Sequence, residues 1–243
     1  MCSIVLLIRP GHRWPLVLAA NRDERVDRPW DPPAGHWPDQ PGVIAGRDRL
    51  AGGTWMGVNA EGVVAAILNR PDSLGPAPGK ASRGGLPLRA LRHATAAAAA
   101  ADASALPGGE YRSFNMFVSD PQETFWLANA GAGPIARRPL APGLWMASAH
   151  DPNDLSAPRI ARHLPRFRAA PPPDPDRGDW EAWRAILGDR SGPAESRLTI
   201  PETEGFATVS ASLLALPAAG PALWLFATGP ADVAPFRQVS PAR

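Results

Sequence analysis

The only cysteine of this 243-residue chain stands second, directly after Met1. Removal of Met1, which a small second residue such as cysteine permits, would make Cys2 the N-terminal residue. Its α-amine would then titrate near ~7.7–8.0, so at neutral pH it can serve as the base that activates the neighbouring thiol. The alternative is that Cys2 is a small buried apolar side chain without a chemical role.

A predicted hairpin places polar residues opposite Cys2. Residues 3–8 and 16–20 are apolar runs separated by a turn that is rich in Pro and Gly, a pattern typical of two antiparallel strands. With the turn centred near His12, paired residues have numbers that add up to roughly 24. Cys2 is therefore expected opposite Arg22, at the end of the hairpin that is far from the turn.

The polar segment at that end supplies the other candidate catalytic residues, Asn21, Arg22 and Asp23. Polar side chains that end an apolar strand must face solvent or one another. We expect Arg22 or Asp23 to orient the amine and the thiol, with the arginine also lowering the pKa of the thiol, and Asn21 to donate to an anion. A solvated turn that caps the hairpin is the alternative, and residue types alone leave both open.

The remaining pattern predicts the elements that must position these side chains. A second hairpin is expected at residues 54–58 and 63–68, with a long ordered loop before it at 26–50. Further expected elements are helices at 86–105, 157–168 and 180–187, and strands at 114–118, 124–127, 144–146, 207–216 and 222–227. This order favours an α+β layered fold with mostly antiparallel sheets, in one domain over residues 1–243 with a Pro-rich linker or loop near 169–178.

Several short signatures occur in order along the chain. They are Met-Cys at 1–2, Leu-Ala-Ala-Asn-Arg-Asp-Glu at 18–24, Gly-Gly-Thr-Trp-Met-Gly at 52–57, Ala-Ile-Leu-Asn-Arg-Pro at 66–71, Ser-Arg-Gly at 82–84 and Phe-Asn-Met at 114–116. With these signatures the sequence resembles the NRDE family, also called the transport and Golgi organisation family. The resemblance spans nearly the whole chain and is densest in residues 1–120.

The resemblance implies an N-terminal-nucleophile hydrolase-like fold, an αββα sandwich of two mostly antiparallel sheets. It also implies a distant relation to the cysteine amidohydrolases that cleave penicillin V and conjugated bile salts. Carried over by motif, Cys2 is the nucleophile, Asp23 positions its amine, and Asn69 takes an oxyanion-hole position. An amide donor there is expected to contribute roughly 10²–10³ in rate.

The sequence also departs from those hydrolases. The arginine that they carry three residues before the aspartate is replaced here by Ala20, and the nearest arginine is Arg22. A Ser-Asn pair corresponds to Ser148 and Ala149, and the arginine of a late Gly-Thr-Arg-Ser stretch corresponds to Val209. These differences imply fewer polar groups around the nucleophile.

Four further residues are candidate ligand contacts. Trp55 belongs to a group of tryptophans in the first quarter of the chain, with Trp14, Trp30 and Trp37. This group either lines an apolar cleft or packs against the hairpins. Arg83 is expected to bind an anionic group, with a surface salt bridge as the alternative. Asn115 lies in the Phe-Asn-Met signature, and His150 precedes an aspartate close to the expected site.

Composition excludes several classes of protein. The 25 basic and 23 acidic side chains nearly cancel, which leaves no basic stripe for nucleic acid. No pair of the five histidines has metal-ligand spacing, and no apolar stretch approaches the ~20 residues of a membrane span. We expect a cytoplasmic protein without a metal site or a resident cofactor, with a composition typical of a GC-rich bacterial genome.

Two functions follow as hypotheses. The first is an N-terminal cysteine hydrolase that acts on a small amide or thioester. The second, which the resemblance implies because eukaryotic relatives are linked to haem handling and lipid metabolism, is a non-catalytic protein that binds haem or an acyl-CoA-like or lipid-like ligand. In both, the partner is a small molecule.

Overall fold

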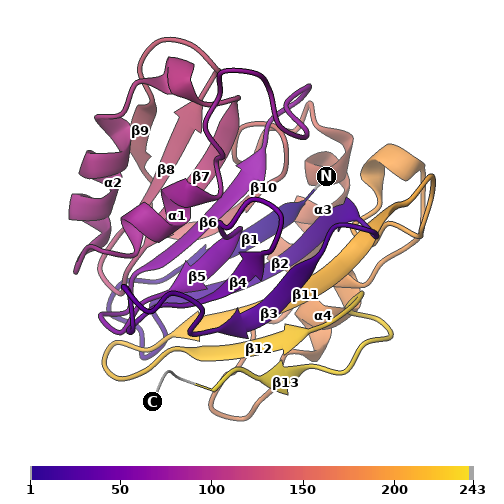
Figure 1. Cartoon of the computed structure of the whole chain (residues 1–243). Helices are drawn as coiled ribbons and strands as arrows, with labels where there is room; N and C mark the ends of the chain where they lie inside the picture. The colour runs from indigo at the N-terminus through magenta and orange to yellow at the C-terminus, as the bar shows by residue number, and fades with distance from the viewer. Residues whose placement is uncertain (1, 241–243) are drawn as a thin grey trace.

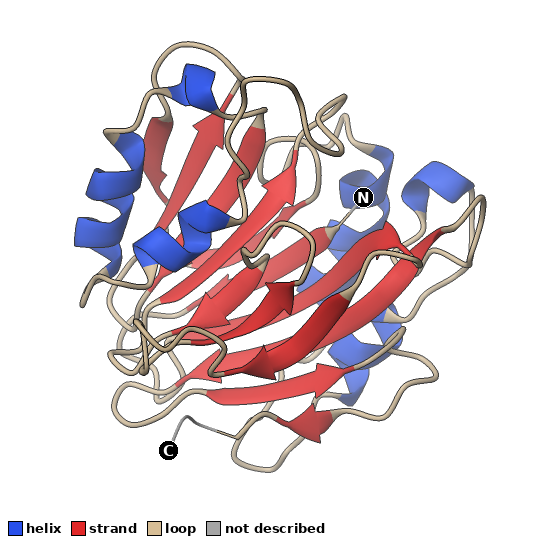
Figure 2. Cartoon of the chain, in the orientation of Figure 1, coloured by secondary structure: helices blue, strands red, loops and turns tan. Residues whose placement is uncertain are grey.

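Two antiparallel β-sheets lie face to face at the centre of the molecule (Figures 1 and 2). The computed structural model describes residues 2–240. The first sheet has the order β10 (Gly143–Ala147), β1 (Ser3–Ile8), β2 (Leu16–Arg25), β11 (Phe206–Leu216), β12 (Leu223–Ala227) and β13 (Arg237–Gln238). The second has the order β3 (Trp30–Ala34), β4 (Ile44–Asp48), β5 (Met56–Val58), β6 (Val64–Asn69), β7 (Phe114–Ser119), β8 (Thr124–Asn129) and β9 (Ala136–Pro139).

Helices cover the outer face of each sheet. The second sheet is covered by α1 (Gly85–Ala90) and α2 (Ala96–Ser104), and the first by α3 (Pro158–Ala169) and α4 (Glu181–Leu187) (Figure 2). Two single turns of 3-10 helix, Gly108–Glu110 and Ala194–Ser196, complete the helical elements of the described residues. The predicted α+β sandwich with αββα layers is confirmed.

Within residues 2–240, no helix combines the length and the apolar character that crossing a bilayer requires.

Alternation along β1 divides its side chains between two cores. Ile4 and Leu6 pack between the sheets, whereas Val5 packs under α3 and α4. Each fully buried aliphatic side chain of this kind contributes roughly 1.5–3 kcal/mol. The β1–β2 register pairs Ser3 with Asn21 and Ile8 with Leu16, which confirms the predicted hairpin.

The prediction of one long loop over residues 26–50 is wrong, because this segment forms β3 and β4. Pro32 and Pro33 obscure the strand pattern, since proline cannot donate to a sheet ladder. The structure accommodates them because β3 is the edge strand of the second sheet. The sequence pattern also does not predict two short strands, β9 and β13.

The helix predicted over residues 86–105 is divided into α1 and α2. Thr95 ends the interruption: its backbone is extended, and its hydroxyl accepts a hydrogen bond from the Ala98 N–H at 3.2 Å. The Asn59 side-chain amide donates to the carbonyls of Leu91 and His93 at 2.9 and 2.8 Å. These bonds satisfy carbonyls that a continuous helix would use internally. The other predicted strands and helices match observed elements, with bounds that differ by a few residues at most.

Two of the glycine signatures meet in space. The Thr54 N–H donates to the Gly84 carbonyl at 2.9 Å, which joins the Gly-Gly-Thr-Trp segment to the Ser-Arg-Gly segment. At Gly53, a Cβ atom would lie 2.4 Å from the carbonyl carbon of Gly84. Only glycine allows the two backbones to approach this closely.

We therefore expect Gly53→Ala to lower the free energy of unfolding by at least about 2 kcal/mol, because backbone atoms must move to admit the methyl group. The matched control is Gly35→Ala, since a Cβ there meets no atom within 4 Å. Urea unfolding of both variants checks the expectation. Equal stability of Gly53→Ala and Gly35→Ala would contradict it.

Candidate functional site

The Cys2 thiol lies against the main chain of Asp23. The Asp23 N–H donates to Sγ at 3.4 Å, and the thiol donates to the Asp23 carbonyl at 3.6 Å. Cys2 is half-buried and directly precedes β1, whereas Asp23 lies near the end of β2. The hairpin therefore brings Cys2 and the predicted polar segment together. The predicted removal of Met1 concerns a residue outside the described part of the chain.

The environment of Cys2 favours the protonated thiol. Burial raises the pKa of the Cys2 thiol, and the negative charge of Asp23 raises this pKa further. The Asp23 N–H and the guanidinium of Arg22 lower it, but the raising effects prevail. A base is therefore needed to generate the thiolate at neutral pH.

The Asp23 carboxylate lies in a buried network on the helix-covered side of the first sheet. Its Oδ2 accepts from Arg159 Nη1 at 3.2 Å, and its Oδ1 accepts from the Thr208 hydroxyl at 2.6 Å. Arg159 Nη1 also donates to the Ser3 hydroxyl at 3.1 Å. Strand β11 is irregular between Thr208 and Ser210, and such a bulge re-aims the side chains beside it.

Arg22 lies on the opposite face of β2, between the sheets. Its side chain is only 6% exposed, and its guanidinium carbon lies 4.2 Å from the ring centroid of Trp55 and 5.9 Å from that of Trp30. The two rings meet edge to face at 5.8 Å. Burial lowers the pKa of Arg22, although an arginine remains cationic at neutral pH.

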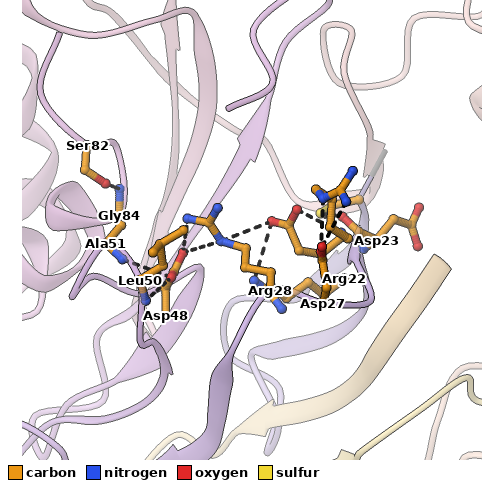
Figure 3. Close-up of polar contacts among 12 residues, drawn as sticks. Arg22, Asp23, Asp27, Arg28, Asp48, Leu50, Ala51, Ser82 and Gly84 are labelled. Atoms are coloured by element: carbon orange, nitrogen blue, oxygen red, sulfur yellow. Dashed lines mark hydrogen bonds and ion pairs between the residues drawn. The ribbon is translucent and has the colours of Figure 1, made fainter. Parts of the chain in front are cut away.

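A row of alternating charges extends from Arg22 to the loop after β4. Glu24 lies 3.5 Å from Arg22 and 3.8 Å from Arg28, and Arg28 lies 2.7 Å from Asp48. Figure 3 shows Arg28 between Asp48 on one side and the Arg22 segment on the other. Asp48 also accepts hydrogen bonds from the main chain of residues 50 and 51, so the row holds this loop in place.

A small cavity of about 30 Å³ adjoins Cys2 between the sheets. Its wall includes Cys2, Arg22, Trp55, Leu68, Ser210 and Ser212. This space is large enough for water or for a small polar group of a ligand. A larger ligand would therefore have to reach Cys2 from the solvent-exposed side of this half-buried residue.

Two asparagines predicted for the site are placed differently. Asn21 donates to the carbonyls of Leu187 and Leu198 at 3.0 and 2.9 Å, so its donors hold α4 and the segment after it rather than an anion. Asn69 is half-buried at the end of β6, does not line the cavity, and makes no side-chain hydrogen bond to a described residue. Its oxyanion role stays a prediction that rests on the resemblance.

Asn115 links the two sheets. Its amide donates to the carbonyls of Ser148 and His150 at 3.2 and 2.8 Å, and its oxygen accepts from Arg70 at 2.7 Å and from Trp126 at 3.1 Å. These contacts occupy both ends of the amide, which indicates a structural link. The His150 side chain is half-buried and makes no hydrogen bond to a described residue, and Ala149 beside it is fully buried.

Arg83 lies near the end of the loop that connects β6 to α1. Its Nη1 donates to the Ser73 hydroxyl and to the Ser113 carbonyl, both at 2.9 Å. Burial and the positive charge of Arg112 lower the pKa of Arg83 to about 10. The salt bridge weighed from the sequence is not formed with any described residue.

The four tryptophans in the first quarter of the chain pack in three different places. Trp30 and Trp55 pack against Arg22, whereas Trp14 packs against the core under α3 and α4, and Trp37 against the core under α1 and α2. Only Trp55 lines the Cys2 cavity. Most of this group therefore packs against the strands and does not line an apolar cleft.

Sequence reasoning missed Arg159 and Thr208. One signal for Arg159 exists: it shares a helical face with the buried His163 and Phe167, four and eight residues on, and a charge on an apolar face needs a partner. Thr208 had no such signal, because the position of the bulge is not visible in the sequence. Among residues 2–240, no cluster of three or more histidine, cysteine or acidic side chains is arranged to hold a metal ion.

The family model described as Transport and Golgi organisation 2 matches residues 1–170. The chain belongs to this family. A mouse relative, a Transport and Golgi organization 2 homolog, is 36% identical over 76 residues, which cover 28% of this chain. The match spans only 27% of the length of the mouse protein.

Solved structures share the fold. An N-acylethanolamine-hydrolyzing acid amidase ortholog from Caenorhabditis elegans aligns with a TM-score of 0.58 at 11% identity, over 90% of this chain and 94% of that one. A mutant conjugated bile acid hydrolase from Clostridium perfringens aligns with a TM-score of 0.51 at 11% identity, over 99% and 97% of the two chains. The fold of this family member is therefore that of N-terminal-nucleophile hydrolases.

The buried Asp23–Arg159 pair generates a stability prediction. We expect Arg159→Met to lower the free energy of unfolding at pH 7 by about 3–5 kcal/mol, because it removes a cationic partner from the buried Asp23 carboxylate. Asp23→Asn combined with Arg159→Met should cost clearly less than the two single changes together. Urea unfolding of the cycle tests this, with the exposed Arg168→Met of the same helix as the control. Strict additivity would rule out the coupling.

Proposed function

We propose that this chain is an N-terminal cysteine hydrolase that cleaves an amide or thioester bond of a small molecule. The observation that carries the proposal is the contact between the Cys2 thiol and the Asp23 main chain, at the chain end of a fold shared with an amidase and a bile acid hydrolase. After removal of Met1, Cys2 would carry both the nucleophile and its base.

The proposed reaction uses the chain's own groups in two steps. The α-amine takes the thiol proton, Sγ attacks the carbonyl carbon, and the leaving amine or thiol departs with that proton. Water then attacks the acyl-thioester with the amine as base, which frees the acid and restores the thiol. Asp23 would hold the amine, and the Arg22 charge would stabilise the thiolate.

A second candidate function has one observation in its favour. A cavity of about 750 Å³ lies at the other end of the sheets, with a wall that includes Ile44, Val58, Leu216 and Trp224. This volume is typical of small-molecule sites, and these four side chains are apolar, whereas Asn59 and Glu61 add polar groups to the wall. Non-catalytic binding of haem or of an acyl-CoA-like or lipid-like ligand in this cavity is therefore the alternative function.

Cys2→Ala separates the two functions. The wild-type protein should hydrolyse a thioester probe through an acyl adduct at Cys2, which intact-mass measurement of the quenched reaction detects, and Cys2→Ala should form no adduct. The melting temperature should change little, because the substitution removes one half-exposed sulfur atom. Full acylation of Cys2→Ala would overturn the hydrolase proposal.

Cys2→Ala also tests the alternative function, which is non-catalytic ligand binding. Saturable quenching of tryptophan fluorescence by haem or a long-chain acyl ligand, equal in wild type and Cys2→Ala and without acylation, would favour binding in the larger cavity. Acylation at Cys2 without such quenching would favour the hydrolase.

A further inference from the structure

Arg22 holds a buried positive charge with an unused donor. Its Nη1 atom is buried and has no hydrogen-bond partner among the described residues. Its one carboxylate neighbour, Glu24, lies at 3.5 Å and is shared with Arg28. A buried donor without an acceptor costs roughly 1–3 kcal/mol, and more when it is charged. The Nη1 donor of Arg22 therefore has no acceptor among the described residues, and Arg22 lines the Cys2 cavity.

Arg83 is a second, partly buried guanidinium, and unlike Arg22 it has no counter-ion among the described residues. Its two partners, the Ser73 hydroxyl and the Ser113 carbonyl, are neutral, and it forms no ion pair with a residue in the range 2–240. Its near neighbour Arg112 is also cationic and donates only to main-chain carbonyls of the loop at 72–76. Neither of these two neighbouring cations has an ion-pair partner within residues 2–240.

The fold brings the segment of Arg83 close to residues that line the cavity beside Arg22. The Thr54–Gly84 hydrogen bond places the segment of Arg83 beside Trp55, whose ring lies against Arg22. On the other side, Ser113 immediately precedes Phe114, which pairs with Asn69, the neighbour of the cavity-lining Leu68. The negative charge of Glu24 raises the pKa of both guanidiniums, and a thiolate at Cys2 would do the same.

We propose that Arg22 and Arg83 form an anion-binding subsite beside Cys2, which takes a carboxylate, sulfonate or phosphate group of the ligand. An oxyanion would accept from the unused Arg22 donor and would supply the counter-charge that Arg83 lacks. That this group belongs to the acyl compound attacked by Cys2 rests on the proposed hydrolase function; the anion binding itself does not.

The first arm of the test measures binding without catalysis. Cys2→Ala protein is titrated calorimetrically with adipate, hexanesulfonate, hexylphosphonate and the neutral hexanamide. At least one anion should bind about tenfold or more tightly than hexanamide, and the order of the three identifies the preferred group. Arg22→Gln and Arg83→Gln, each in this background, should remove the preference. Arg83→Lys should keep part of it, and the exposed Arg168→Gln should keep all of it.

The second arm measures acylation of the wild-type protein by adipoyl and hexanoyl N-acetylcysteamine thioesters. These probes differ only in the terminal carboxylate, and the adipoyl rate should exceed the hexanoyl rate about tenfold. Thermal unfolding of each variant shows that it is folded.

The outcomes of the two arms are distinct. Equal binding of anions and hexanamide, or no binding of any of the four, overturns the subsite, even if both thioesters acylate Cys2. Anion binding that depends on Arg22 and Arg83, without acylation by either thioester, supports the subsite and overturns the hydrolase. A preference that survives both arginine substitutions also overturns the subsite.

Discussion

The antiparallel pairing of β1 with β2 is the constraint on which the site depends. Its register places Ser3 opposite Asn21, so the next pair outward brings Cys2 to Arg22 and the thiol to the Asp23 main chain. A shift by one residue would move every side chain of the strand to the other face. Such a shift would take Ser3 away from Arg159 and would exchange the side chains of β1 between two different cores.

The same pairing separates two charge networks on the two faces of β2. Asp23 meets Arg159 and Thr208 on the side of the helices, whereas Arg22 meets Trp55 and Glu24 between the sheets. The first network is a buried ion pair with hydrogen-bond partners. The second leaves a buried donor beside Cys2 without an acceptor. Cys2 lies where the two networks meet.

Local pattern was enough to predict the hairpin, its register and the layered fold, because alternation and turn residues act over a few neighbouring positions. It failed where distant contacts decide the outcome. Asn59 and Thr95 interrupt the expected long helix, an edge position admits Pro32 and Pro33 into a strand, and α3 supplies Arg159 to Asp23. Asn21 was expected to donate to an anion, but main-chain carbonyls that lie more than 160 residues further along the chain accept both of its bonds.

The proposed reaction depends on a free α-amine at Cys2, so the most direct test is the intact mass of the purified protein, with sequencing of its first residues. We expect a chain that is lighter by one methionine residue and begins with Cys2. Retention of Met1 would leave the amine inside a peptide bond, where it cannot act as a base. That result would contradict the self-activated nucleophile.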